Sequence, residues 1–347
     1  MTKVAVRHLD ANEASVLPEE YISKIGFAGL DVWLGFVQNH YGYPFVRLEA
    51  RQGNAVSGFL SMTMVHHPIF GRFLTTAPYA SYGGFVFSSQ ETRDALLTEA
   101  ASLCQDADAE YAVVRFAAGN SNPPMGWQQH PVYATYLVEL ASNPDLLMPA
   151  FSSNHRNHIR KSQKRGFSTK FGHLDLLDDA YEAIARSMHE LGSPYHHKDY
   201  LRRMADALGK KLEFAVVYDS NGELAGGGVF ILHGDRVSNL HANILRAHRS
   251  DYAGEFLYWS AVQRYCEAGL RTFDLGRSLI GSGNEYFKMK WSPRRQMLAY
   301  WYALPPDKPL PAINQKNPKF QLAIAVWKKL PRAVVRLFGP TLIRGLA

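Results

Sequence analysis

The order of elements in the second half of the sequence constrains the fold most strongly. Two apolar runs, EFAVVYD and LAGGGVFILHG, flank Asn221-Gly222, and this dipeptide between such runs is a strong β-hairpin signal. An amphipathic stretch over 255–268, closed by Gly269, predicts a helix, which the strand-like RTFDL and a glycine-rich segment follow. This alternation predicts an α/β half with a mixed sheet, whose last strand we expect at MLAYWYAL.

The first half has the composition of a second α/β body. Helix-like stretches at 31–39 and 91–105 flank runs of strand composition at 43–48, 55–65 and 112–116. The strand-like YATYLVEL closes this half. A chain of 347 residues is too long for one ordinary core and suits two domains of about 150 to 200 residues. We expect an N-terminal domain over 1–145, a C-terminal domain over 146–310 and a basic tail over 311–347.

Cysteine content and hydropathy restrict the compartment of the cell in which such a chain is expected. The two cysteines, Cys104 and Cys266, have neither the number nor the spacing of a disulfide framework, which fits a reducing cytoplasm. The first residues lack the apolar core of a secretory signal. No stretch approaches the ~20 apolar residues that cross a bilayer. We expect a cytoplasmic protein that does not span a membrane.

The positive charge is concentrated at the end of the chain. The formal net charge is +7, and no acidic residue follows Asp307. A nearly neutral body with a basic tail does not fit a DNA-binding protein, whose charge would spread along a docking face. From Phe320 to Leu346 apolar and basic residues mix, and Pro331 and Pro340 predict a division into short helices. Two readings stay open for 317–347: contact with an anionic membrane surface, or packing against the second domain.

Two further segments have candidate binding residues. In RFLTTAPYASYGGFVFSS, Gly83 and Gly84 let the backbone pass close to a ligand or to another strand, so Tyr82 and both glycines are candidate substrate contacts. The stretch 154–165 carries several basic residues and no acidic one, and like charges repeated at four-residue spacing repel one another. A phosphate-bearing partner or plain solvation would offset them. The candidates on this stretch are Arg156, Arg160 and Lys161.

The segment FDLGRSLIGSGNEYFKMKW, residues 273–291, is the strongest candidate site. Asp274 ends a strand, and glycines follow it at the strand's carboxyl end, where open α/β sheets bind ligands. Backbone N–H groups of such a loop, with a basic side chain beside them, suit an oxyanion or a phosphate. The spacing matches neither a P-loop nor a dinucleotide fingerprint. The candidates in and after this loop are Asp274, Arg277, Ser278, Gly281, Gly283, Glu285 and Lys288.

The same segment resembles a motif of FemAB-related proteins. DLGRSLIGSGNEYFKMKW is similar to their D-F-G-R-S, G-S/T-G and F-K-x-x-W-G elements, in order. APYASYGG, SSNHRNHIRKSQKRGF and HELGSPYHHKDYL are similar to further segments of the family. The last 30 residues or so resemble the tail of members associated with exosortase and exopolysaccharide loci. The resemblance therefore covers most of the chain.

The resemblance implies two GNAT-like α/β domains in tandem and transfer of an acyl or aminoacyl group to an amine. The donor would be aminoacyl-tRNA or acyl-CoA, with no tightly bound cofactor. The acceptor would be a nucleotide- or lipid-linked saccharide or peptide precursor of peptidoglycan or exopolysaccharide, met in the bacterial cytoplasm or at the inner face of the plasma membrane. Lys288 matches the family lysine near the reacting carbonyl, and Arg156 and Arg160 match basic residues of the helix between the domains.

Two departures from the family pattern concern the donor pocket. The glycine expected after Trp291 is Ser292, which Pro293 follows. In HRSDYAGEF, Arg249 and Gly254 only loosely match the loop with which acetyltransferases hold the CoA pyrophosphate at a helix N-terminus. The sequence therefore leaves the donor open.

Aminolysis of an ester or thioester needs a free amine and a stabilised oxyanion, but no covalent nucleophile. We expect Lys288 to stabilise the oxyanion, Asp274 or Glu285 to accept the amine proton, and Arg277 to hold a phosphate or carboxylate. The plain alternative for Asp274 is an ion pair with Arg277 that shapes the loop.

We expect no metal site, because the pairs His155/His158 and His196/His197 lack a third ligand in the sequence. Three functions stay open. The first is a FemAB-type N-acyltransferase, the second is an acyl-CoA-dependent N-acyltransferase acting on an amino sugar or peptide amine, and the third is a non-catalytic binding protein of a polysaccharide locus.

Overall fold

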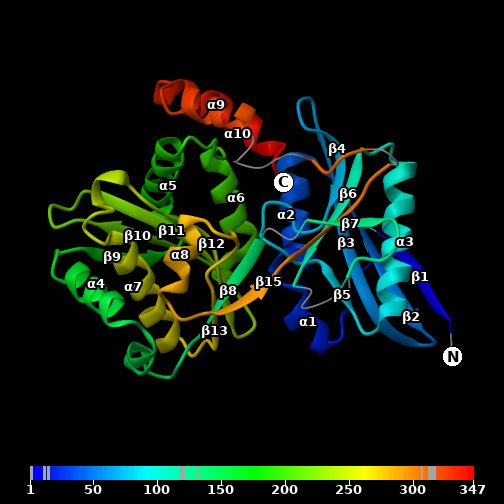
Figure 1. Ribbon diagram of the computed structural model, residues 1–347, viewed down its shortest axis with the longest axis horizontal. Helices are drawn as coiled ribbons and strands as arrows, with labels where there is room; N and C mark the ends of the chain where they lie inside the picture. Colours follow the sequence, from blue (N-terminus) through cyan, green and yellow to red (C-terminus); the bar gives the residue numbers. More distant parts are fainter. Residues whose placement is uncertain are drawn as a thin grey trace. The chain divides into compact units, whose positions relative to one another are not determined.

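The computed structural model describes residues 3–10, 13, 16–117, 122–130, 133–305, 308–311 and 318–347. They form two compact units (Figure 1). Unit 1 comprises the described residues within 1–133, 297–312 and 344–347, and unit 2 comprises those within 134–296 and 313–343. Both units are discontinuous in sequence, whereas the predicted domains are continuous.

Unit 1 contains a mixed sheet of eight strands with helices α1 (Glu19–Ile25), α2 (Asp31–Tyr41) and α3 (Gln90–Asp106). The sheet is antiparallel except for the parallel pair β4 and β6. Leu60 and Met62 of the sheet and Leu96 and Leu97 of α3 are fully buried in its core. The strands in sheet order are β1 (Val4–Leu9), β2 (Phe45–Gln52), β3 (Ala55–His67), β4 (Gly71–Thr75), β6 (Tyr111–Phe116), β16 (Ala299–Ala303) and β7 (Trp127–Gln129), with β5 (Phe85–Phe87) paired to β3.

Unit 2 is built on a second mixed sheet of eight strands, whose two faces are covered by α5 (Leu177–Leu191) and α7 (Ala253–Glu267). A Cβ on Gly227 would lie 3.3 Å from Ala183 of α5, whereas Phe230 packs on Tyr265 of α7. The strands in sheet order are β14 (Ser278–Leu279), β8 (Tyr133–Glu139), β13 (Thr272–Asp274), β12 (Arg236–Ile244), β11 (Leu224–His233), β10 (Leu212–Tyr218) and β9 (Ser168–Gly172), with β15 (Arg294–Met297) paired to β8. The further helices are α4 (Ser153–Gln163), α6 (Lys198–Leu208) and α8 (Gly283–Met289).

Two predicted strands lie in the opposite sheet from the one expected. MLAYWYAL was expected to end the second sheet, but its strand β16 pairs with β6 and β7 in unit 1, where Trp301 is fully buried. YATYLVEL forms β8 in the second sheet, next to β13, and buries Tyr136 and Val138 in the core of unit 2. Alternating hydrophobicity identifies a strand and its buried face, but both cores accept the same apolar side chains.

The tail forms α9 (Pro318–Trp327) and α10 (Arg332–Arg344). Pro331 separates the two helices as predicted, but Pro340 lies inside α10 and does not divide it. Arg332 and Arg336 both pair with Glu182 of α5, and the carbonyl of Trp327 lies 3.2 Å from His189 Nε2. Of the two readings for the tail, packing against the second half is observed, while residues 312–317, including Lys316, lie outside the described residues. Among the described helices, none has the length and hydropathy to cross a membrane.

Candidate functional site

Lys288 is buried in unit 2, and its ammonium is held by the loop that precedes α8. Nζ donates to the carbonyl oxygens of Gly276 and Arg277, each at 2.8 Å, and lies 5.7 Å from the centroid of the Tyr136 ring. Burial lowers the pKa of Lys288 to about 7, while the charge of Asp274 opposes the shift and that of Arg277 adds to it. An ammonium with this pKa exchanges its proton near neutral pH.

Asp274 fixes the first turn of the same loop at the end of β13. Its carboxylate is buried, and Oδ1 accepts hydrogen bonds from Thr135 Oγ1 at 2.5 Å and from the Gly276 N–H at 2.9 Å. Gly276 has a φ of 75°, which lets the chain turn directly after the strand. Asp274 therefore combines a position beside Lys288 with a loop-shaping role, whereas the side chain of Arg277 is exposed.

Glu285 closes the other end of the loop. Oε1 accepts from Tyr136 Oη at 2.7 Å and lies 3.1 Å from Arg295, while Oε2 accepts from the Gly281 N–H at 2.5 Å. The backbone hydrogen bond from Gly281, more than the contacts with Tyr136 and Arg295, holds the pKa of this carboxyl below its usual range. Glu285 is therefore a weaker proton acceptor than an ordinary glutamate, and its contacts are those of a loop clamp.

Between these two carboxylates the loop carries a buried hydroxyl and two glycines with open surroundings. The Ser278 hydroxyl is buried and has no hydrogen-bond partner among the described residues. A Cβ on Gly281 or Gly283 would meet no atom within 4 Å. Buried hydroxyls are normally hydrogen-bonded, so Ser278 offers an unused donor to a bound group.

Helix α4 carries the predicted basic residues on the surface of unit 2. Ser152 caps the helix by accepting from the His155 N–H at 3.2 Å. Arg156 is half-buried and donates to the carbonyl oxygen of Phe151, whereas Arg160 and Lys161 are exposed. The structure thus engages Arg156 and leaves Arg160 and Lys161 to solvent.

Tyr82, Gly83 and Gly84 lie in unit 1, where the close approach is between backbone segments. The N–H groups of Gly83 and Gly84 donate to the carbonyl oxygens of Arg115 and Ile25, at 2.9 and 2.8 Å. A Cβ on Gly83 would lie 2.7 Å from the Ile25 oxygen. Of the two alternatives for this pair, the contact with other protein segments is the one observed, and a role for Tyr82 in binding substrate stays a prediction.

The N-terminus of α7, where the loose CoA-loop match falls, has no side-chain cap, and the side chains around it contact other protein groups. Arg249 Nε donates to the Ile244 carbonyl oxygen at 3.1 Å, and Tyr252 adopts a left-handed conformation with φ 64° directly before the helix. Glu255 in the first turn is buried and lies 3.2 Å from Lys290 Nζ. A carboxylate is the favoured occupant of a helix N-terminus. Sequence reasoning missed this pair, because Glu255 and Lys290 are far apart in the chain.

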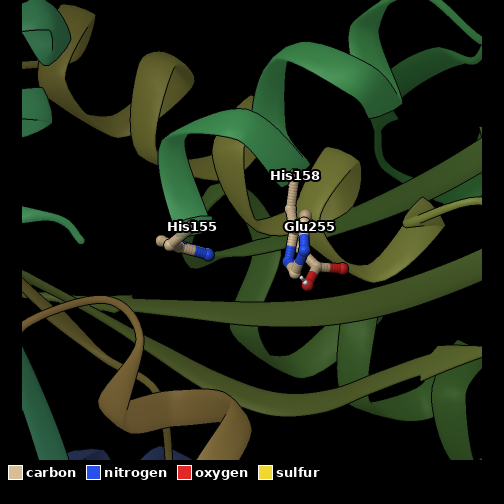
Figure 2. A group of neighbouring side chains, drawn as sticks. All are labelled: His155, His158 and Glu255. Atoms are coloured by element: carbon tan, nitrogen blue, oxygen red, sulfur yellow. Dashed lines mark ion pairs between the residues drawn. The ribbon is translucent and has the colours of Figure 1, made fainter. Parts of the chain in front are cut away.

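Glu255 also lies beside the two histidines of α4 (Figure 2). One ligand atom from each of His155, His158 and Glu255 lies within 4.8 Å of the others. His155 is 1% exposed, and burial lowers its pKa to about 4. The sequence showed the His155/His158 pair, but only the fold supplies the third side chain.

Comparison with known proteins identifies the fold. Residues 151–289 match the family described as the acetyltransferase (GNAT) domain. No curated protein matches the sequence. The crystal structure of FemX is similar with a TM-score of 0.67 and 12% identity, covering 86% of this chain and 97% of FemX.

Two further solved structures share this architecture. L-PGS from Bacillus licheniformis has a TM-score of 0.54 and 13% identity, with 93% of this chain and 97% of that chain covered. A tandem GNAT protein from the clavulanic acid biosynthesis pathway has a TM-score of 0.53 and 14% identity, with 88% and 100% covered. The fold that the FemAB resemblance implies is thus confirmed. The matched domain includes β13, the glycine loop and Lys288, and the chain is an acyltransferase with the tandem GNAT fold.

Proposed function

We propose that this protein transfers an aminoacyl or acyl group to an amine on a cell-wall or exopolysaccharide precursor. The observation that carries the proposal is the ammonium of Lys288, buried at the carboxyl end of β13 against the Gly276 and Arg277 carbonyls. A fixed cation in a site of low dielectric constant stabilises a developing oxyanion far better than it would in water. The resemblance of the loop to FemAB-related proteins supports the amine acceptor.

The proposed reaction is a single aminolysis. The neutral acceptor amine attacks the carbonyl carbon of the donor ester or thioester, and the electron pair of the carbonyl moves to the oxygen, which Lys288 stabilises. The C–N bond forms and the amine proton passes to Asp274. Collapse of the intermediate breaks the C–O or C–S bond, and Asp274 returns the proton to the leaving oxygen or sulfur, which departs as the alcohol or thiol. We assign the proton to Asp274, because it ends β13 beside Lys288, whereas the lowered pKa of Glu285 makes that carboxyl a weaker proton acceptor than an ordinary glutamate. Arg277 and Ser278 then hold an anionic group of the substrate.

We favour aminoacyl-tRNA over acyl-CoA as the donor. A CoA pyrophosphate binds a helix N-terminus through free N–H groups. At α7, Arg249 of the loose CoA-loop match donates instead to the Ile244 carbonyl oxygen, and Glu255 places a buried carboxylate in the first turn, which disfavours a pyrophosphate there. The exposed basic side chains of Arg160 and Lys161 suit a phosphate backbone.

The donor is tested by comparing turnover on one amine acceptor with aminoacyl-tRNA and with acyl-CoA, alongside the thermal stability of the protein with each donor. Turnover and stabilisation with aminoacyl-tRNA alone support the favoured donor. Turnover and stabilisation with acyl-CoA alone support the acyl-CoA-dependent alternative. Binding with no turnover for any donor supports a non-catalytic binding protein and contradicts the transferase proposal.

We also propose that the tail contacts an anionic membrane surface, where a lipid-linked acceptor would be met at the inner face of the plasma membrane. Four large apolar side chains on α9 and α10 are more than half exposed, beside Lys328 and Lys329: Leu322, Val326, Leu337 and Phe338. Apolar and basic groups on one amphipathic element are typical of interfacial helices.

Substitution is a cleaner test of this contact than deletion of 317–347, because Arg115 Nη2 donates to the Ala347 oxygen at 2.6 Å in unit 1. We expect Leu337→Asp with Phe338→Asp to abolish pelleting with anionic vesicles. Pelleting equal to that of the wild type would contradict the proposed membrane contact, but it would not bear on the transferase proposal.

A further inference from the structure

Two helices of unit 2 bring three side chains of the types that ligate metals together (Figure 2). His155 and His158 are three residues apart on α4 and therefore share one face of that helix. Glu255 comes from the first turn of α7, which packs against α4. Their ligand atoms lie within 4.8 Å of one another.

The hydrogen bonds of this cluster are incomplete. His155 is 1% exposed, yet neither of its ring nitrogens has a hydrogen-bond partner among the described residues. His158 Nδ1 also has none, because its 3.8 Å separation from Glu255 Oε1 is too long for a hydrogen bond. Buried polar atoms of folded proteins are almost always satisfied, so the two imidazoles lack a partner that a bound ion would supply.

We propose that His155, His158 and Glu255 bind a divalent transition-metal ion, with zinc as the best fit. Two imidazoles and one carboxylate form a ligand set that zinc uses in proteins, with a fourth position left for water. Metal–ligand bonds of ~2.0–2.2 Å require these atoms to be ~3.3 Å apart, so the three side chains draw together on binding. The side chain of His158 is 17% exposed and gives the ion its path from solvent.

Lys290 competes with the ion for the carboxylate. Its Nζ lies 3.2 Å from Glu255 Oε1, so an arriving cation meets a like charge that must withdraw. The site therefore predicts an unusual result: removing a charge from a residue that ligates nothing strengthens metal binding. A cluster with a purely structural role predicts no such gain.

The bound ion would hold α4 against α7. Helix α4 carries Arg156 and Arg160, so the ion would position the predicted phosphate-binding face without taking part in the transfer. The proposed metal site depends only on the geometry of unit 2. It does not depend on which acyl donor the protein uses.

The test uses the full chain, stripped with a chelator and titrated with Zn²⁺ by competition with a chromophoric chelator. Co²⁺ serves as the spectroscopic probe, because its absorption reports coordination number and imidazole ligands. The ligand variants are His155→Ala and Glu255→Gln, the competitor variant is Lys290→Gln, and the control is His66→Ala, an exposed histidine of unit 1. Circular dichroism of each metal-free variant checks that it folds.

We expect one equivalent of Zn²⁺ to bind the wild type and His66→Ala equally, and each ligand variant to bind at least ~100-fold more weakly. Lys290→Gln should bind several-fold more tightly. If His155→Ala fails to fold, Glu255→Gln decides the matter, since it preserves size and shape. Absence of stoichiometric binding to the wild type, or equal binding by folded Glu255→Gln, would overturn the site.

Discussion

Unit 1 and unit 2 each contain a glycine-rich segment that the sequence predicts to be a ligand loop. The two segments differ in what surrounds their glycines. At Gly84 of unit 1 the N–H donates to a neighbouring backbone, and a Cβ would lie 2.6 Å from Ser61 Oγ. At Gly281 of unit 2 a Cβ would meet nothing within 4 Å. Both glycines have a φ of 77°, so they differ in surroundings and not in backbone conformation.

The comparison separates two uses of glycine that look alike in sequence. In unit 1 the missing side chains of Gly83 and Gly84 let protein segments touch. The N–H groups of both glycines donate to neighbouring backbone carbonyl oxygens. In unit 2, Gly281 and Gly283 are exposed and border open space, on the loop that also carries the Ser278 hydroxyl, which has no hydrogen-bond partner among the described residues. Of the two segments, the unit 2 loop is therefore the stronger candidate for a ligand site.

The largest effect on stability that we expect is the difference between two alanine substitutions. Both Gly84→Ala and Gly281→Ala place a side chain at positive φ, which costs ~1–2 kcal/mol. Gly84→Ala adds overpacking of ~1–3 kcal/mol against Ser61. Urea denaturation should therefore show the larger loss of unfolding free energy for Gly84→Ala. Equal losses of unfolding free energy would contradict the difference in packing between Gly84 and Gly281.

The next effect concerns the pH dependence of turnover. The pKa of Lys288 is about 7, so the ammonium that stabilises the oxyanion is lost as the pH rises through that value. For an acceptor amine with an ordinary lysine pKa of ~10.4, the reactive neutral fraction rises tenfold per pH unit. We expect kcat/KM to rise up to about pH 7 and then level off, because the two effects cancel.

The comparison variant for this profile is Lys288→Ala, whose residual kcat/KM should keep rising above pH 7, since it has no ammonium to lose. The same break near neutral pH in both proteins would exclude Lys288 as its origin.

The smallest effect concerns Glu285, the clamp of the unit 2 loop. Its pKa is lowered in the folded protein, so its ionised form stabilises the fold above the pKa of the unfolded chain. That contribution disappears as the pH falls through the lower folded value. We expect Glu285→Gln to be less stable than the wild type by under ~1 kcal/mol at neutral pH, with the gap closing in acid.

Thermal unfolding of both proteins across this pH range measures the gap. A gap that widens in acid would have the wrong sign for a clamp of this kind.

The local pattern predicted the elements of the fold better than their partners. The hairpin at Asn221-Gly222 joins β10 and β11, and the amphipathic stretch before Gly269 is α7. The sheet membership of β8 and β16 was not predictable, because each strand offers an apolar face that either core accepts. Pro340 continues α10 against expectation, and no local signal distinguishes it from Pro331.

In the candidate site, too, residues close in sequence were predictable and contacts between distant segments were not. The motif in 273–291 brought Asp274, Glu285 and Lys288 together, because they lie on one short loop and helix. The roles of Glu255 and Lys290 at the start of α7 depend on contacts between distant segments. Such contacts are set by tertiary packing, which the sequence pattern does not show.

The most direct test of the account is the turnover of Lys288→Ala, compared with Lys211→Ala, which removes an exposed lysine of the same unit. Both should fold, as circular dichroism can verify. If the buried ammonium stabilises the oxyanion, kcat falls by ~10²–10³ in Lys288→Ala and stays at the wild-type value in Lys211→Ala. A folded Lys288→Ala protein whose kcat stays within a few-fold of the wild type would contradict the assignment of the chemistry to this loop.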